Sequence, residues 1–323
     1  MKYFFTLIIM CVAFTVQSQQ LGQYTMYMLN QYRTNSAYAG LDNSLSATGV
    51  FRSQWVGLEG SPTMQNINLH MPMYIINGGI GLNVENITLG AEQNLSAKLS
   101  YAFHKVVGNV GILSIGAGAG IYQKSLDGNR LRTPGGDYVE NTPINHNDQI
   151  LSEAQESAIT PIFDIGVFYQ SEKLEIGASA VNLVEPKVNL NTNVNFQLKR
   201  HYFLTMAYNW EVSNLLTFQP SIMAKSDLTE TQLEISAIVK YDDNIFVGTA
   251  FRGYSQNTID AAAFLAGIKL SEKITLAYSY DLTLSSYNSV SNGSHEILIK
   301  YNLNKTIGAG VPPRIIHNPR FLE

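Results

Sequence analysis

The chain has 323 residues, of which 45% are hydrophobic and 14% are charged, well below the roughly one quarter of charged residues in a typical soluble domain. Its formal net charge is −4 and its basic residues are dispersed, which argues against nucleic acid as a partner. Tyr (18) and Phe (14) are abundant, as in the aromatic girdles at the two edges of a bilayer. The composition therefore argues against an ordinary water-facing surface.

Residues 1–18 are predicted to be a cleaved signal peptide. Lys2 supplies a positive charge, residues 4–14 form a short apolar run, and Val16 and Ser18 are small residues suited to a cleavage site. The only cysteine, Cys11, lies inside this run, so the mature chain is predicted to hold no disulfide and no cysteine-ligated metal. After Ser18, no apolar run approaches the roughly 18 residues of a transmembrane helix, which leaves strands to cross a membrane.

Residues 19–43 precede the first predicted strand and show no strand alternation. They are rich in Gln, Tyr, Asn and Met, and we expect them to plug a lumen or to lie across its periplasmic mouth. The alternative is a capped turn that leads into the first strand. Both alternatives, the plug and the capped turn, concern one group of residues at the end of this segment: Asn35, Ala37, Tyr38, Ala39 and Gly40.

Residues 44–303 alternate between apolar and polar side chains along almost their whole length. In residues 274–284, Ile, Leu and Tyr fall on one parity, whereas Thr, Ala, Ser and Asp fall on the other. This alternation is typical of strands with one apolar face. The polar parity mixes Gly, Ser and Thr with single charges, which suits a lumen better than a dry core. The apolar parity predicts a set of lipid-facing or interfacial aromatic residues: Trp55, Tyr169, Tyr208, Trp210, Tyr278 and Tyr280.

The connections between the predicted strands fall into a short set and a set that contains the long ones. The short ones lie near 104–109, 171–173, 212–214, 242–244 and 271–273, and the long ones are 124–157, 185–198 and 285–293. Outer-membrane barrels have short periplasmic turns and longer outside loops. We therefore predict an all-β, single-domain, transmembrane antiparallel β-barrel of about 14 strands over residues 44–303, with a polar lumen. An exported β-solenoid or sandwich is the alternative.

Residues 304–323 are predicted to form a periplasmic tail without strands, since they hold Pro312, Pro313 and Pro319. An even number of strands places both ends of the barrel in the periplasm.

The sequence shows no catalytic constellation, so we predict a protein that is not an enzyme and needs no cofactor or metal. G-x-S-x-G and H-E-x-x-H are absent. Gly116, Gly118 and Gly120 fall mid-strand, where they would make room for a plug or a bend. Acidic residues of the longest loop lack regular calcium-ligand spacing, which favours a solvated loop over a calcium site. Six lumenal charges either define an ion or solute path or neutralise one another: Arg52, Asp164, Glu234, Arg252, Asp281 and Lys300.

Three stretches carry motifs beyond the strand pattern. They are QYTMYMLNQYRTNSAYAG (23–40), FRSQWVGLEGSPTMQ (51–65) and SYDLTLSS…NGSHEILIKY (279–301). Together they resemble the blocks of the PorP/SprF family, outer-membrane proteins of the type IX secretion system. Besides Asn35 to Gly40, the matching positions are Arg52, Gln54, Trp55, Gly57, Pro62, Gly293, Ser294, His295 and Glu296.

The resemblance implies an outer-membrane barrel that supports export or surface attachment of adhesin-like cargo proteins, including gliding adhesins. It implies two protein partners, namely the C-terminal domain of a secreted cargo protein and, for one branch of the family, a periplasmic peptidoglycan-binding lipoprotein of the secretion machinery. Outer-membrane lipid is the third predicted partner, which the apolar parity of the strands implies. Two alternatives remain open at this point. The barrel could be a solute-uptake channel, or a structural anchor that joins the outer membrane to periplasmic machinery.

The longest loop is the predicted cargo contact, because loops on a rigid scaffold commonly carry recognition. Its charged, aromatic and amide groups suit a polar protein interface. The alternative is a loop that only shields the barrel mouth. The candidate contact residues are Arg130, Arg132, Asp137, Tyr138 and His146.

Overall fold

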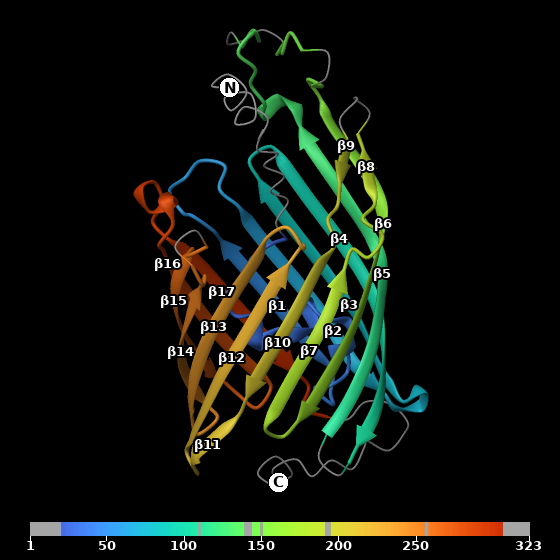
Figure 1. The fold of residues 1–323 in the computed structure, drawn as a ribbon, viewed down its shortest axis with the longest axis vertical. Coiled ribbons are helices and arrows are strands. Elements are labelled where there is room, and N and C mark those ends of the chain that lie inside the picture. The colour runs from blue at the N-terminus through green and yellow to red at the C-terminus, as the bar shows by residue number, and fades with distance from the viewer. Residues whose placement is uncertain are drawn as a thin grey trace, which may run out of the picture.

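The computed structural model describes residues 21–108, 111–138, 144–148, 151–190, 195–255 and 258–305. The predicted signal peptide and almost all of the predicted tail lie outside these residues. The described part is all-β, and 14 antiparallel strands close into a barrel (Figure 1). The predicted fold class is therefore confirmed, and the sandwich and solenoid alternatives are wrong.

The barrel strands follow one another around the wall in chain order. They are β1 (Ser46–Ser53), β2 (Thr63–Met73), β3 (Gly78–Leu89), β4 (Glu92–Val107), β5 (Gly111–Asp127), β6 (Gln155–Ser171), β7 (Leu174–Val181), β10 (His201–Tyr208), β12 (Leu216–Ser226), β13 (Thr231–Tyr241), β14 (Ile245–Arg252), β15 (Ala261–Lys269), β16 (Ile274–Thr283) and β17 (Ser294–Asn302). The pairings β1–β17 and β10–β12 close the ring.

Shorter elements lie outside this ring. The strand β11 (Trp210–Ser213) extends the β10 side and pairs with β12, and β8 (Lys187–Asn189) and β9 (Asn195–Gln197) form a separate two-stranded sheet. The helical elements of the described residues are 3-10 turns: η1 (Tyr27–Leu29), η2 (Gln31–Arg33), η3 (Ser36–Tyr38), η4 (Tyr74–Ile76), η5 (Gly128–Arg130) and η6 (Ser286–Ser289). In the part of the chain that the structure describes, no helix has the length and apolar character needed to cross a membrane.

Burial alternates along the strands with the apolar parity outward. In β16, Tyr278 and Leu282 are 44% and 43% exposed, whereas Ser279 and Asp281 are fully buried. Apolar side chains are thus exposed all around the wall, an arrangement that suits contact with lipid rather than with water. The outward set includes Phe51, Ile67, Leu99, Phe163, Leu204, Ile235, Phe264 and Ile299.

The prediction that Trp55 faces lipid or its interface is wrong. Its parity would point outward only if β1 continued, but β1 ends at Ser53 and Trp55 has a positive φ of 51°. The indole instead stacks on the ring of Tyr287 and lines a cavity inside the barrel mouth. Tyr208, Trp210 and Tyr278, by contrast, are exposed on the outside, as predicted.

The two ends of the barrel differ in the length of their connections. At one end, here the turn end, the connections are 74–77, 108–110, 172–173, 209–215, 242–244 and 270–273. At the other, the loop end, they are 54–62, 90–91, 128–154, 182–200, 227–230, 253–260 and 284–293. The three longest predicted loops all lie at the loop end, although β5 and β6 continue further than predicted. In Figure 1 the described residues of the longest loop, and the strands β8 and β9, rise above the rim.

Residues 21–43 run inside the barrel, and we call them the plug (blue in Figure 1). Tyr24, Met26, Tyr32 and Ala37 are buried. The side chains of an eight-stranded barrel nearly fill its interior, so a barrel of 14 strands needs a further segment to fill its lumen. The predicted plug is confirmed, and it extends past the turn-end mouth through the lumen as far as a cavity at the loop end.

Candidate functional site

The turn-end half of the plug is held by the side chain of Asn35. Its Oδ1 accepts a hydrogen bond from Ala37 N (2.9 Å), which caps η3. Its Nδ2 donates to the carbonyls of Val167 in β6 (3.0 Å) and Ala178 in β7 (3.3 Å). The hydroxyl of Ser114 in β5 donates to Ala37 O (2.5 Å). One short motif thus contacts three neighbouring strands.

Glycines in the wall make room for this motif. A Cβ at Gly116 would lie 2.5 Å from Ala37 Cα, and one at Gly166 would overlap Asn35 Oδ1. A Cβ at Gly118 would lie 2.8 Å from the hydroxyl of Ser36. The prediction that mid-strand glycines admit a plug is therefore confirmed for Gly116 and Gly118. Gly120 differs, because its Cβ would meet the wall backbone at Ala97.

We expect Gly166→Ala to loosen the plug while the barrel still forms. The new methyl group displaces the Asn35 amide, which then loses its hydrogen bonds to β6 and β7, at a cost of about 1–3 kcal/mol. The measurement is the temperature at which the barrel loses its compact form on heat-modifiable gel electrophoresis. Gly49→Ala is the matched control, because a Cβ at Gly49 has no neighbour within 4 Å. Equal midpoints for the two variants would contradict this account.

The plug joins β1 through a tight turn at Gly40 and Asp42. Gly40 has φ +83°, and a Cβ there would lie 2.8 Å from Gly79 Cα, so the close approach to β3 requires glycine. The Tyr38 hydroxyl donates to Asp42 (2.9 Å), which also pairs with the ammonium group of Lys300 (2.8 Å). Burial favours the neutral acid, but Lys300 and His70 hold the pKa of the Asp42 carboxyl well below its usual range.

A buried ion-pair cluster holds the loop-end half of the plug. Two arginines from the wall, Arg52 and Arg252, both contact Asp281, at 2.7 and 3.3 Å. Both also donate to the hydroxyl of Thr25 in the plug, at 3.1 and 3.0 Å, and this hydroxyl donates to Asp281. Glu234 accepts from Arg252 Nε at 2.8 Å. The hydroxyl of a single plug threonine therefore contacts three charged side chains of the wall.

Glu296 fastens the plug backbone to the same cluster. Its carboxylate accepts from the backbone N–H groups of Thr25 (2.8 Å) and Met26 (3.0 Å), and it pairs with Arg52, its register partner across β1 and β17 (3.2 Å). Asp164 likewise pairs with Lys98. The six lumenal charges noted in the sequence all take part in ion pairs, so the mutually neutralising interior fits the structure better than a solute path.

The remaining motif positions lie in or next to two loop-end connections, 54–62 and 284–293, and hold these two connections together. Trp55 stacks on Tyr287 with ring centroids 4.5 Å apart, and its backbone N–H donates to the hydroxyl of Ser294 (3.1 Å). Gly57 and Gly293 have φ of +98° and +83°, where a side chain would be strained. Other motif positions lie beside these: Gln54 donates from its N–H to Pro62 O, and His295 contacts Tyr278 on the outer surface.

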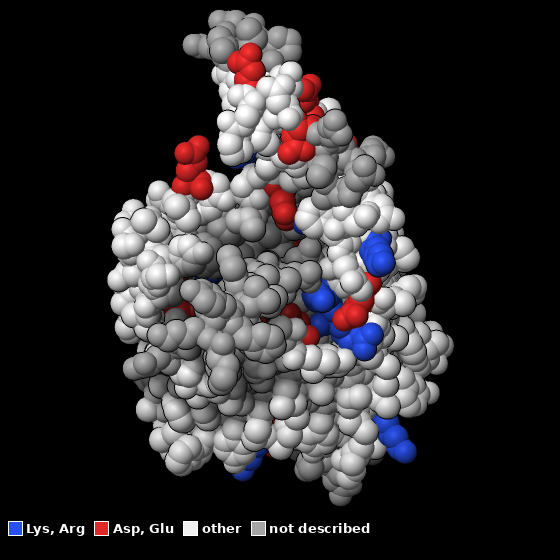
Figure 2. Space-filling model, turned by 45° about the horizontal axis from the view of Figure 1, so that its top comes forward, with Lys and Arg blue, Asp and Glu red and all other residues white. Residues whose placement is uncertain are grey.

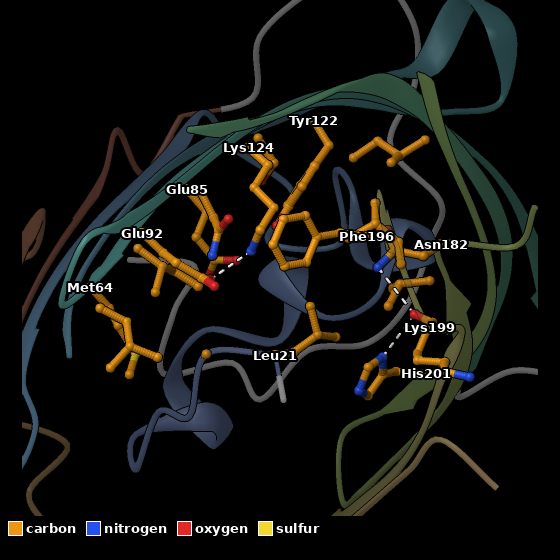
Figure 3. Close-up of a pocket in the computed structure, with 18 of the residues that line it drawn as sticks. Leu21, Met64, Glu85, Glu92, Tyr122, Lys124, Asn182, Phe196, Lys199 and His201 are labelled. Carbon is orange, nitrogen blue, oxygen red and sulfur yellow. Dashed lines mark hydrogen bonds and ion pairs between the residues drawn. The ribbon is translucent and has the colours of Figure 1, made fainter. Parts of the chain in front are cut away.

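A cavity of about 1160 Å³ opens above the plug at the loop end (Figures 2 and 3). Its floor includes Leu21 and Arg33 of the plug, and its walls come from both the barrel and the β8–β9 hairpin. Two ion pairs lie along one side, Arg33–Glu85 at 3.0 Å and Lys124–Glu92 at 2.6 Å. Figure 2 shows charged side chains gathered inside this hollow.

Comparison with known proteins identifies the family. The type IX secretion system membrane protein family PorP/SprF matches residues 16–301. The chain belongs to this family. The match spans the plug and the barrel up to the penultimate residue of β17, so the three motif blocks belong to one continuous family domain. No curated protein matches the chain significantly.

Solved structures similar to this PorP/SprF protein are barrels with low sequence identity. A Pseudomonas aeruginosa FadL homologue is 12% identical with a TM-score of 0.44, over 80% of this chain and 89% of that one. The CymD monoaromatic hydrocarbon channel is 10% identical with a TM-score of 0.48, over 90% and 95%. The Acinetobacter baumannii outer-membrane protein Omp33 is 4% identical with a TM-score of 0.44, over 80% and 97%. These values concern the fold alone.

The candidate loop residues of this PorP/SprF protein divide into two groups. Arg130, Arg132 and Asp137 are exposed, whereas His146 is buried and Tyr138 is half-buried. The Tyr138 hydroxyl contacts His146 Nδ1 (3.0 Å), and His146 Nε2 contacts the Gly128 carbonyl (3.0 Å). His146 thus shapes the loop, whereas the charged side chains of Arg130, Arg132 and Asp137 lie at its surface. Among the described residues, no acidic or histidine cluster is arranged to hold a metal.

Sequence reasoning missed Thr25 and the walls of the cavity. Thr25 lies inside the N-terminal motif, but its partner Arg252 is 227 residues away. Glu92, Lys124 and His201 line the cavity from separate strands. The motif itself was the only signal for Thr25 in the sequence. Sequence spacing does not predict contacts between distant residues that come together only when the barrel closes.

Proposed function

We propose that this barrel supports export and surface attachment of an adhesin-like cargo protein, by holding the C-terminal domain of that cargo at the loop end. Membership of the PorP/SprF family supports a role in type IX secretion, and the barrel supports a place in the outer membrane. The barrel acts as a rigid mount rather than as an enzyme. Gliding adhesins are one class of cargo that fits this role.

The observation that carries the proposal is the plug. It is fastened to opposite sides of the lumen, to β5, β6 and β7 near the turn end and to β1, β14, β16 and β17 near the loop end. A lumen filled by charged and hydrogen-bonded groups is poorly suited to passing solutes, which makes the uptake channel the weaker candidate. The long connections at one end supply the surface for a partner.

The proposed arrangement assigns different partners to the two ends. The loop end faces outward and meets cargo, whereas the turn end faces the periplasm, where the peptidoglycan-binding lipoprotein of the secretion machinery binds. Short periplasmic turns and long outside loops are the general rule in such barrels. A purely structural anchor would need only the second contact.

Replacing residues 128–154 with a short Gly/Ser turn should remove cargo from the cell surface. The measurement is surface cargo by immunofluorescence or protease shaving, with barrel abundance and heat-modifiable folding checked in the same strain. A finer variant, Arg130→Glu with Arg132→Glu, reverses two exposed charges and should reduce surface cargo, because cargo docked through complementary charges would be repelled.

Lys269→Glu with Lys273→Glu is the matched control, since both lysines lie at the turn end. It should leave surface cargo unchanged. If the loop replacement also leaves surface cargo unchanged, the loop is not the contact, and the structural-anchor alternative gains support.

A further inference from the structure

We propose that the loop-end cavity binds an extended acidic peptide segment, which pairs as an added strand with the free edge of β9. This inference rests on the proposed function, because the peptide would belong to the exported cargo. It concerns the cavity above the plug and does not involve the longest loop.

The cavity carries more positive than negative charge. Five basic side chains line it, Arg33, Lys98, Lys124, Lys187 and Lys199, against two carboxylates, Glu85 and Glu92. Both carboxylates already pair with lining bases, and Lys98 pairs with Asp164 below. This surplus is notable in a chain whose net charge is −4.

The surplus lies on the side of β10 and the β8–β9 hairpin. Among the described residues, no carboxylate lies within ion-pair distance of Lys187 or Lys199. The same holds for Lys225 of β12, which is only 6% exposed. Lys225 is the register partner of Phe203, a cavity residue, so the two side chains lie next to each other on the lumen face. A mostly buried ammonium group without a carboxylate beside it favours an anionic ligand, and a carboxylate would supply the missing charge pair.

Backbone geometry favours a peptide over other anions. Among the described residues β9 pairs with β8 alone, so its other edge has no strand partner there, and all three β9 residues line the cavity. Exposed edges accept extended peptides as an added strand. Figure 3 shows Phe196 of β9 extending toward Tyr122 and Lys124, and Lys124 Nζ lies 4.3 Å from the Phe196 ring centroid.

Side chains that suit a peptide surround this edge. Seven amide residues and five aromatic residues line the cavity. Aromatic residues are enriched at protein interfaces, and amide side chains can both donate hydrogen bonds to a peptide backbone and accept them from it. The amides are Gln23, Gln54, Asn94, Asn182, Asn189, Asn195 and Gln197, and the aromatic residues are Trp55, Tyr122, Phe196, Phe203 and Tyr287.

The test is fluorescence anisotropy with the full-length barrel in detergent. The probe is a labelled peptide in which Asp and Glu alternate with Ser and Gly, compared with the same peptide carrying Asn and Gln. We expect the acidic peptide to bind at least about tenfold more tightly, with an affinity that falls as salt rises. Lys199→Gln with Lys225→Gln should abolish this preference, whereas Lys269→Gln with Lys273→Gln at the turn end should keep it. Heat-modifiable migration confirms that each variant is folded.

A second probe tests strand addition without altering the protein. N-methylation of alternate backbone amides removes the N–H donors of the acidic peptide and should weaken its binding about tenfold. Any of three results would overturn the inference. The acidic and neutral peptides could bind equally, or N-methylation could have no effect. An anionic polysaccharide could also displace the probe more strongly than unlabelled acidic peptide does. If the peptide does not bind but surface cargo still depends on the longest loop, the inference fails and the proposed function stands. If the acidic peptide binds as expected but surface cargo does not depend on the barrel, the proposed function is overturned instead.

Discussion

Deletion of residues 23–38 should open an aqueous pore through a barrel that still folds. The plug contributes the buried side chains at the centre of the lumen, including Tyr24, Met26 and Tyr32. Without it, water enters and hydrates the charges of the Arg52–Asp281 cluster, so these charges are not left dry and unpaired. We expect conductance in planar bilayers to rise by about tenfold or more, since barrels of this size without a plug approach the width of aqueous channels.

Cysteine labelling provides an independent readout of the same variant. Ser279 points inward and is fully buried, whereas Tyr278 is exposed on the outer face of the barrel. A membrane-impermeant thiol reagent should therefore modify Ser279→Cys only after the plug is deleted, and Tyr278→Cys in neither background. Unchanged conductance together with unlabelled Ser279→Cys would show that residues 23–38 do not close the pore.

Arg52→Met should strongly destabilise the intact protein. With the plug in place, Asp281 and Glu296 stay buried but lose the guanidinium that contacts both. Breaking a buried pair in this way costs about 3–5 kcal/mol. The measurement is the urea midpoint of unfolding, followed by tryptophan fluorescence and by heat-modifiable migration.

Two controls separate lost charge pairing from lost packing. Arg132→Met changes the same type of side chain at an exposed position of the longest loop and should shift the midpoint little. The exchange Arg52→Glu with Glu296→Arg keeps a pair between register partners of β1 and β17, so it should recover part of the loss. If Arg52→Met and Arg132→Met behave alike, the buried cluster does not stabilise the plug.

Strand position and the orientation of each face were predictable because they depend on neighbouring residues. Side chains alternate along a strand with a period of two, so residues 274–284 revealed both faces of β16 before the fold was known. The pattern failed at Trp55, where a positive φ ends the strand and turns the ring inward. The alternation pattern records only whether a residue is apolar. It therefore does not detect a change of backbone direction at an apolar residue.

The N-terminal motif predicted a plug, but it did not predict how far the plug extends into the lumen or which residues hold it there. Residues 35–40 lack strand alternation, and the mid-strand glycines of β5 suggested where they pack. Thr25 gave no comparable signal, because its contacts with Glu296 span 271 positions of the chain. These contacts exist only because the barrel closes between β1 and β17 and surrounds the plug.

The sequence by itself determined the all-β class, the approximate strand number, the lipid-facing parity and the division into short and long connections. Each follows from periodicity or composition within a few consecutive residues. The tertiary structure alone decided how Arg52, Arg252 and Asp281 neutralise one another around Thr25. It also decided that a basic cavity with a free strand edge lies above the plug. Closure of the ring brings these distant residues together, and no local pattern in the chain encodes which of them will meet.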